Sequence, residues 1–139
     1  MKKYTCGIIC GSFDVIHPGY VRMFKDAKRV CERLTVALQG DPTIDRPSKC
    51  KPVQSMEDRI EILESIKWID KVVVYNTEKE LDVLLGNESY DVRILGTDYK
   101  NRKDYTGAHY GKPVYFHERD HEYSTTKLKM KISESMKNR

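Results

Sequence analysis

The sequence has no long hydrophobic run and no C-x-x-C cysteine pair, and we expect no secretory leader. Its apolar stretches are a handful of residues long, well below the roughly 20 that a membrane-spanning helix needs. The 4 cysteines of the 139-residue chain show no C-x-x-C spacing, which argues against a zinc knuckle or a redox pair. The chain begins MKKYTCGIICGSFD and lacks the small-residue cleavage site of a signal peptide. We therefore expect a cytoplasmic protein with reduced thiols and no membrane partner.

Neither positive nor negative charge is in large excess. The 25 Lys and Arg residues exceed the 21 Asp and Glu residues by only 4. This mild excess suits an anionic ligand, but it is not the concentrated basic face of a nucleic-acid-binding protein. The 9 tyrosines do not cluster with interleaved basic residues into a platform for stacking bases. We therefore expect no nucleic-acid partner.

Short apolar runs alternate with helical patterns along the chain. The helical patterns begin at Pro18, at Ser55 (ending near Trp68), at Glu78 and after Ser124. The apolar runs predict strands at residues 4–10, 34–38, 71–75, 92–95 and 114–116. This alternation predicts an α/β fold with a mostly parallel five-stranded sheet flanked by helices. The length suits one domain at residues 1–132, followed by a frayed tail at residues 133–139.

The first candidate ligand site joins the first strand to the first helix. Residues 11–14 read Gly-Ser-Phe-Asp, and His17, Pro18 and Gly19 open the helix. Ligands bind beyond the carboxyl ends of parallel strands, and the free amides of a helix N-terminus attract phosphate. Taken alone, the segment also fits an ordinary tight turn whose histidine is structural.

Two further clusters carry groups that bind anions. Arg119 precedes the hydroxyl run at residues 124–126, which places hydroxyls and amides at the start of the last helix. The long loop after the second strand carries Arg46, Lys49 and Lys51, whose charges suit a polyphosphate. The alternatives are a plain helix cap and a solvated charged loop.

The two ends of the chain resemble one known family. Residues 11–20, GSFDVIHPGY, resemble the G-x-F-D-x-x-H-x-G-H signature of the cytidylyltransferase-like nucleotidyltransferases. Residues 119–127, RDHEYSTTK, are similar to the R-x-x-x-x-S-T-T-K motif of that family. The order and separation of the motifs are most similar to the bacterial glycerol-3-phosphate cytidylyltransferases, over nearly the whole chain. The resemblance implies a Rossmann-like nucleotidyltransferase fold, a homodimer, and Mg²⁺ with CTP.

The resemblance also implies a reaction and the residues that perform it. CMP would pass from CTP to a small phosphorylated acceptor such as glycerol 3-phosphate, with release of pyrophosphate, in cell-surface polymer biosynthesis. His17 would contact the α-phosphate, and Lys49, Lys51 and Arg119 would hold the other phosphates. Arg59 and Lys67 would bind the acceptor, and no residue is assigned as a metal ligand. The implied nucleotide-binding residues are Gly11, Ser12, Phe13, Asp14, Gly19, Tyr20, Gly96, Asp98, Ser124, Thr125 and Thr126.

Two departures from the family pattern leave alternatives open. Tyr20 stands where the family has its second histidine, and Lys67 stands where close relatives carry arginine. A phenol stays neutral at pH 7, whereas an imidazole can carry charge. Either Tyr20 replaces the second donor, or His17 suffices, or the chain binds nucleotide with weakened catalysis. The same chemistry on a sugar, ribitol or amino-alcohol phosphate, or with another nucleoside triphosphate, is the alternative for the substrates.

Overall fold

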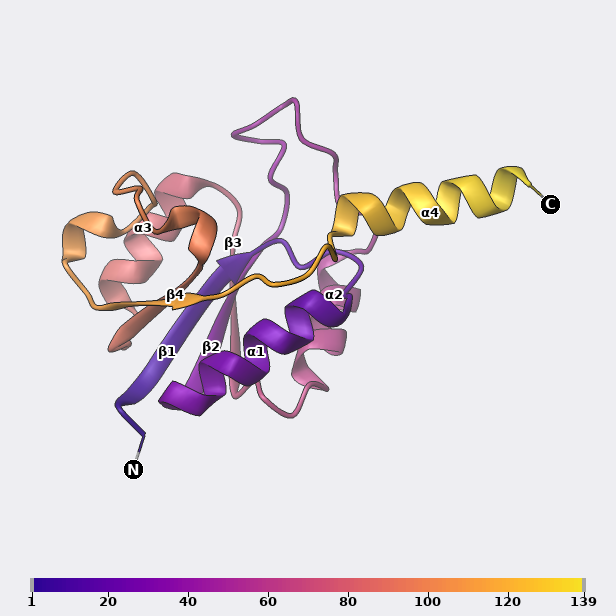
Figure 1. Ribbon diagram of the computed structural model, residues 1–139. Coiled ribbons are helices and arrows are strands. Elements are labelled where there is room, and N and C mark those ends of the chain that lie inside the picture. Colours follow the sequence, from indigo (N-terminus) through magenta and orange to yellow (C-terminus); the bar gives the residue numbers. More distant parts are fainter. Residues whose placement is uncertain (1, 139) are drawn as a thin grey trace.

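Five parallel strands form one sheet in the computed structural model, which describes residues 2–138 (Figure 1). The strands lie in the order β3-β2-β1-β4-β5, so the order reverses between β1 and β4. Every pair of neighbouring strands is parallel, which confirms the predicted Rossmann-like sheet. The strands are β1 (Tyr4–Gly11), β2 (Cys31–Gln39), β3 (Lys71–Tyr75), β4 (Val92–Gly96) and β5 (Val114–His117).

Within residues 2–138, three helices and two short 3-10 turns connect the strands, and a fourth helix follows the last strand. Each helix begins at a side chain that accepts a main-chain amide, and these caps are His17, Ser55, Thr77 and Ser124. The helices are α1 (Pro18–Val30), α2 (Met56–Glu64), α3 (Glu78–Asn87) and α4 (Thr125–Lys137). The 3-10 turns are η1 (Thr97–Tyr99) and η2 (Ala108–Tyr110).

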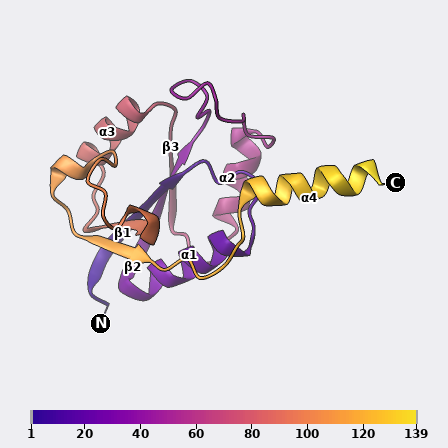
Figure 2. The ribbon, with the colours of Figure 1, turned by 45° about the horizontal axis from the view of Figure 1, so that its top comes forward.

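Helix α4 projects from the rest of the chain, and its C-terminal end lies far from the sheet (Figure 2). None of its side chains is buried, and Met130, Ile132 and Met136 are exposed. Only the start of α4 is therefore positioned to contribute to a site on the domain. Among residues 2–138, no helix combines the length and the apolar character needed to cross a membrane.

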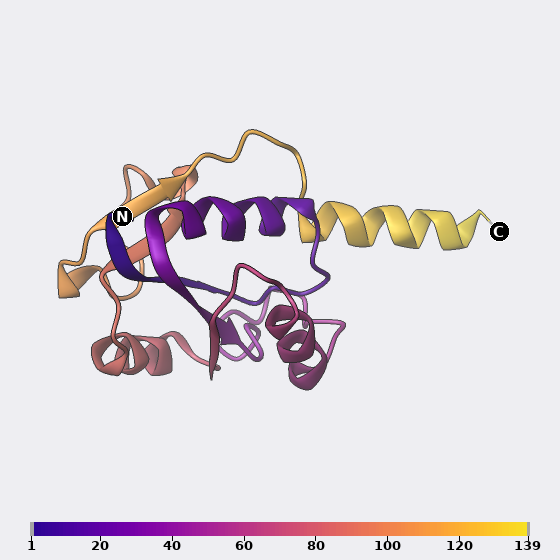
Figure 3. The same cartoon turned by 90° about the horizontal axis from the view of Figure 1, so that it is seen from below.

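Apolar side chains cover both faces of the sheet. Phe24 and Ala27 of α1 and Leu63 of α2 belong to the core on one face. Leu81 and Leu85 of α3 belong to the core on the other face. Figure 3 shows α1 and α3 on opposite sides of the strands. Because both faces are covered, the central strands are continuous apolar runs in the sequence.

Two predicted boundaries differ from those observed by three residues or more. The second helix ends at Glu64, not near Trp68, because the Ser65 amide bonds to carbonyls three and two residues earlier and closes the helix. Strand β2 begins at Cys31, earlier than predicted, because it pairs with β1 from Tyr4 onwards. Helix α4 continues to Lys137, so the fraying of residues 133–139 stays a prediction.

Candidate functional site

The polar loops meet at the carboxyl edge of the sheet. Residues 12–17 follow β1, residues 40–55 follow β2, η1 follows β4, and residues 118–124 follow β5. The strand order reverses between β1 and β4. In open α/β sheets, the crevice at such a reversal is where ligands bind. The clusters predicted from the sequence therefore share one edge of the molecule.

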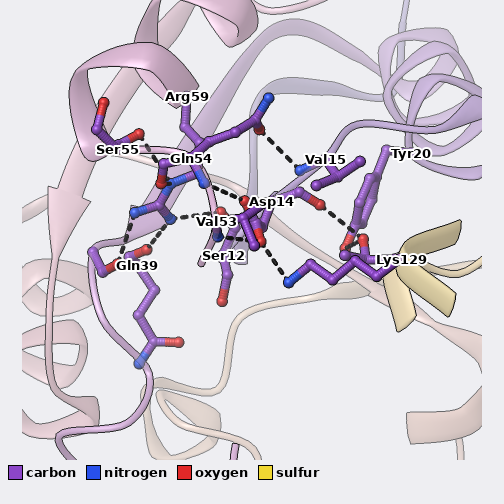
Figure 4. Close-up of polar contacts among 12 residues, drawn as sticks. Ser12, Asp14, Val15, Tyr20, Gln39, Val53, Gln54, Ser55, Arg59 and Lys129 are labelled. Atoms are coloured by element: carbon purple, nitrogen blue, oxygen red, sulfur yellow. Dashed lines mark hydrogen bonds and ion pairs between the residues drawn. The ribbon is translucent and has the colours of Figure 1, made fainter. Parts of the chain in front are cut away.

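Side chains of α4 hold the turn that follows β1 (Figure 4). The Thr125 hydroxyl donates to the Asp14 carbonyl at 2.9 Å and lies 3.2 Å from the Tyr20 hydroxyl. The Lys129 ammonium lies 2.6 Å from the Asp14 carboxylate. The Thr125–Asp14 contact joins residues that are 111 positions apart. The first and last motifs therefore meet at one place in the fold.

The turn after β1 has a strained backbone. Phe13 and Val15 have φ angles of 47° and 53°, in the left-handed region that a β-branched residue such as valine rarely adopts. The Val15 amide donates to Gln54 Oε1 at 2.9 Å, and the Phe13 ring packs against Phe24 in the core. Strain of this kind costs about 1–3 kcal/mol and persists only where the surroundings impose it. Because the Phe13 ring is buried, its side chain is not available to a ligand.

The Asp14 carboxylate is engaged by protein groups. It accepts the amides of Val53 at 2.9 Å and Gln54 at 3.1 Å, in addition to its ion pair with Lys129. Burial by itself would raise the pKa of Asp14, but Lys129 and the two amides outweigh burial and hold the pKa below its usual range. Asp14 thus fastens the segment before α2 to the turn after β1.

Arg59 holds the carboxyl edge of the sheet, which we call the ligand edge, from inside the protein. It is 2% exposed, and its Nη1 donates to the carbonyls of Ser12 at 2.9 Å and Gln39 at 2.7 Å. Its Nη2 donates to Gly40 at 2.7 Å, and its Nε reaches the Gln54 carbonyl at 3.2 Å (Figure 4). Because these donors are engaged by main-chain carbonyls, Arg59 ties the ends of β1 and β2 together. It is not placed as the acceptor-binding cation that the sequence implies.

His17 caps α1 and keeps one ring nitrogen as a donor. Its Nδ1 accepts the Gly19 amide at 3.1 Å, so the neutral ring carries its proton on Nε2. Burial lowers the pKa of His17, and the charges of His121 and Arg119 lower it further. Within residues 2–138, no group accepts a hydrogen bond from Nε2. His17 is therefore a neutral hydrogen-bond donor at pH 7.

Tyr20 is fixed beside His17. The two rings stack with centroids 4.2 Å apart, and Phe13 meets the Tyr20 ring edge-on at 5.2 Å. The Tyr20 hydroxyl is within hydrogen-bond distance of the Thr125 hydroxyl. Tyr20 thus links α1 to α4, and a contact with phosphate would compete with that link.

The cations at the ligand edge are exposed and loosely held. Lys49 is exposed, and Lys51 has one ion pair with Asp41 at 3.8 Å. The Arg119 guanidinium donates to the Tyr123 carbonyl at 2.5 Å. Exposed ion pairs contribute only about 0–1 kcal/mol, so the two lysine side chains can reorient toward an anion at little cost.

The remaining predicted residues divide between the two edges of the sheet. Gly96 ends β4 and Asp98 lies in η1, both at the ligand edge. Lys67 lies in the turn between α2 and β3, at the opposite edge, with its ammonium 4.6 Å from the Trp68 ring centre. Lys67 is therefore not brought to the site by this chain.

Ser124 and Thr126 lie at the start of α4, where the sequence places the hydroxyl run. The Ser124 hydroxyl accepts the Lys127 amide at 3.0 Å as the helix cap, and Thr126 is exposed. Gln54 and Lys129, which hold the turn after β1, were not predicted from the sequence. Lys129 follows Thr125 by four residues, one helical turn, and this spacing was a usable signal. No sequence pattern connects Gln54 to the turn after β1.

Comparisons with known proteins identify the family of the chain. The profile of the family described as cytidylyltransferase-like matches residues 8–136. The chain is 36% identical over 99 residues to the bifunctional protein HldE of Paramagnetospirillum magneticum, covering 70% of this chain and 20% of that protein. It is 37% identical over 95 residues to HldE of Gluconacetobacter diazotrophicus, covering 68% of this chain and 19% of that protein. The chain thus spans about a fifth of the length of these curated relatives.

A solved structure shares the fold. The lipopolysaccharide core biosynthesis protein from Thermoplasma volcanium GSS1 superposes with a TM-score of 0.67 and 19% identity. The match covers 87% of this chain and 99% of that protein. At this identity, the likeness shows that the arrangement of strands and helices is common to both.

Proposed function

We propose that this chain, which belongs to the cytidylyltransferase-like family of nucleotidyltransferases, transfers CMP from CTP to the phosphate of a small acceptor and releases pyrophosphate. The observation that carries the proposal is the Thr125–Asp14 contact, which brings the start of α4 to the turn that leads into α1. The N-terminus of a helix carries a partial positive charge that favours anions. Two such ends at one place suit the triphosphate of a nucleotide.

The residues of the chain act by position and charge. The Nε2–H of His17 donates to an α-phosphate oxygen, where negative charge develops during the transfer. Because Nδ1 is tied to the Gly19 amide, this donor is oriented before the substrate arrives. Arg119, Lys49 and Lys51 neutralise the remaining phosphates. An oxygen of the acceptor phosphate bonds to the α-phosphorus as the bond to pyrophosphate breaks, and no covalent enzyme intermediate forms.

Mg²⁺ enters this proposal with the nucleotide. Within residues 2–138, no three His, Cys, Asp or Glu side chains gather into a metal site. The Asp14 carboxylate is engaged by Lys129 and two amides, so it does not suit direct coordination. Phosphate oxygens and water are ligands that Mg²⁺ prefers. Bound to the phosphates of the nucleotide, the ion would neutralise charge on the leaving pyrophosphate.

Glycerol 3-phosphate is the first acceptor to test, followed by sugar, ribitol and amino-alcohol phosphates. Because Arg59 is engaged and Lys67 lies at the far edge, the acceptor phosphate is left to Arg119 and the two loop lysines, Lys49 and Lys51. A product of this class would serve the biosynthesis of a cell-surface polymer. A homodimer is part of the proposal, since β3 is an edge strand on which Val74 is exposed.

Pyrophosphate release tests the proposal. The full chain with Mg²⁺ is given CTP, ATP, GTP or UTP in turn, each with every acceptor of the panel and with none. We expect release with CTP and one acceptor, well above the blank without acceptor. If calorimetry shows CTP binding while no pair releases pyrophosphate, the chain is a nucleotide-binding module instead.

A further inference from the structure

Two imidazoles from opposite ends of the chain pack against one glycine. A Cβ atom built on Gly19 would lie 2.5 Å from Cε1 of His121 and 2.9 Å from Cε1 and Nδ1 of His17. Distances this short leave no room for a side chain at residue 19. The absence of a side chain at Gly19 therefore lets both rings reach the N-terminus of α1.

Both rings are held in the same way. Nδ1 of His17 accepts the Gly19 amide, and Nδ1 of His121 accepts the Tyr123 amide, each at 3.1 Å and each two residues further along the chain. In a neutral ring whose Nδ1 accepts a hydrogen bond, the proton is on Nε2. His121 therefore offers the same donor, Nε2–H, as His17.

The surroundings of His121 favour its neutral form and include two arginines. Burial lowers the pKa of His121, and Arg119 and Arg22 lower it further. The Tyr123 ring is near all of these side chains. Its centre is 5.2 Å from the centre of the His121 ring, 6.2 Å from that of the His17 ring and 5.2 Å from the Arg22 guanidinium. The charge that draws a phosphate here is supplied by the arginines, and the imidazoles add directed hydrogen bonds.

We propose that His121 is a second imidazole donor to the phosphates of the bound nucleotide, beside His17. The inference rests on the proposed nucleotidyl transfer. Tyr20 stands where the family has its second histidine, but its hydroxyl is linked to Thr125 and its ring stacks on His17. The second imidazole then comes from the motif near the C-terminus instead of from residue 20.

Two substitutions distinguish the loss of the His121 Nε2–H donor from a change in the conformation of the loop. His121→Asn keeps an acceptor for the Tyr123 amide, as in an Asx-turn, but removes the Nε2–H. His121→Gln places an amide donor close to the position of Nε2 but lacks the Nδ1 acceptor. We expect His121→Asn to lower kcat for pyrophosphate release about 100-fold and His121→Gln to stay within about 10-fold of the wild type. His109→Gln is the matched control, since His109 lies in η2 beside Asp82.

The opposite pattern overturns the inference. If His121→Gln is inactive while His121→Asn keeps full activity, the ring acts only through Nδ1 and shapes the loop. If both variants are inactive, Tyr20→His is added to His121→Asn. Recovery of kcat by about 10-fold or more supports a missing imidazole donor, and no recovery contradicts it.

A separate readout distinguishes failure of this inference from failure of the proposed function. If the wild type releases no pyrophosphate, CTP with Mg²⁺ is titrated into the wild type and His121→Asn by calorimetry. Weaker binding by His121→Asn then supports the contact, and equal affinity overturns it. A wild type that binds no CTP overturns both the contact and the proposed function. If the wild type does release pyrophosphate and His121→Asn releases it equally fast, the contact alone is overturned.

Discussion

The turn after β1 and the part of the loop after β2 that carries Lys49 and Lys51 lie at the same edge of the sheet but are held very differently. The turn is held by Arg59, which is buried inside the protein, and by Thr125 and Lys129 of α4. The loop carries Lys49 and Lys51, which are exposed and weakly paired. A preorganised donor costs no reorganisation when charge develops, whereas a loose cation can follow a substrate as it binds. Changes in the turn should therefore harm catalysis or folding, and changes in the loop should affect substrate binding alone.

The largest effect is expected from His17→Asn. Asparagine retains the cap acceptor for the Gly19 amide but lacks the Nε2–H, so kcat should fall by about 10²–10³, or about 2.7–4 kcal/mol. The free energy of unfolding should change by no more than about 0.5 kcal/mol, since Asn is a good cap. Pyrophosphate release and urea unfolding measure the two quantities. Turnover within a few-fold of the wild type would make His17 a structural cap only.

Arg59→Met should cost about 3 kcal/mol of the free energy of unfolding. Methionine fills much of the space, but the buried carbonyls of Gln39 and Gly40 lose a charged donor. Arg29→Met is the control, because the Arg29 side chain is 77% exposed, and it should change stability by no more than about 0.5 kcal/mol. Urea unfolding of both variants decides. A loss below about 1 kcal/mol for Arg59→Met would show that the turn is not fixed by this side chain.

Asp14→Asn should cost about 2 kcal/mol at pH 7, and the cost should depend on pH. The pKa of Asp14 in the folded chain lies below its usual value of 3.8, so the ionised form stabilises the fold above that pH. This stabilisation is lost as the pH falls through the folded-state pKa. The difference in unfolding free energy between wild type and Asp14→Asn should thus shrink below pH 3.8. A difference that stays constant down to about pH 2 would contradict the ion pair with Lys129.

The smallest effect on stability is expected from Lys49→Gln with Lys51→Gln. The double variant should unfold within about 0.5 kcal/mol of the wild type. Its KM for CTP should rise about 10-fold with kcat little changed, as expected when binding is lost equally in the ground and transition states. Steady-state kinetics with the best acceptor measures both constants. A fall in kcat as large as that of His17→Asn would place the lysines in the preorganised part of the site instead.

Much of the fold could be predicted from local patterns. The apolar runs at β3 and β5 and the cap at Ser55 are visible in the sequence because each depends on neighbouring residues. The end of α2 could not be predicted, because the apolar spacing continues past Glu64 while the hydrogen bonds of Ser65 close the helix. The early start of β2 depends on pairing with β1, which no local pattern encodes.

The site divides in the same way. The two motifs identify His17 and Thr125, because phosphate-binding helix starts have recognisable residue types. The position of Arg59 inside the protein could not be predicted, since a charged residue on a helix is more often exposed. His121 was missed because its proximity to Gly19 arises only when β5 delivers the last loop to α1.

The central claim is that one nucleotide is bound jointly by the starts of α1 and α4. Amide NMR of the ¹⁵N-labelled chain during a titration with CTP and Mg²⁺ tests it most directly. We predict that the amides of Gly19 and Thr126 shift together and fit one dissociation constant. Shifts confined to one of the two helix starts, or to neither, would contradict the claim.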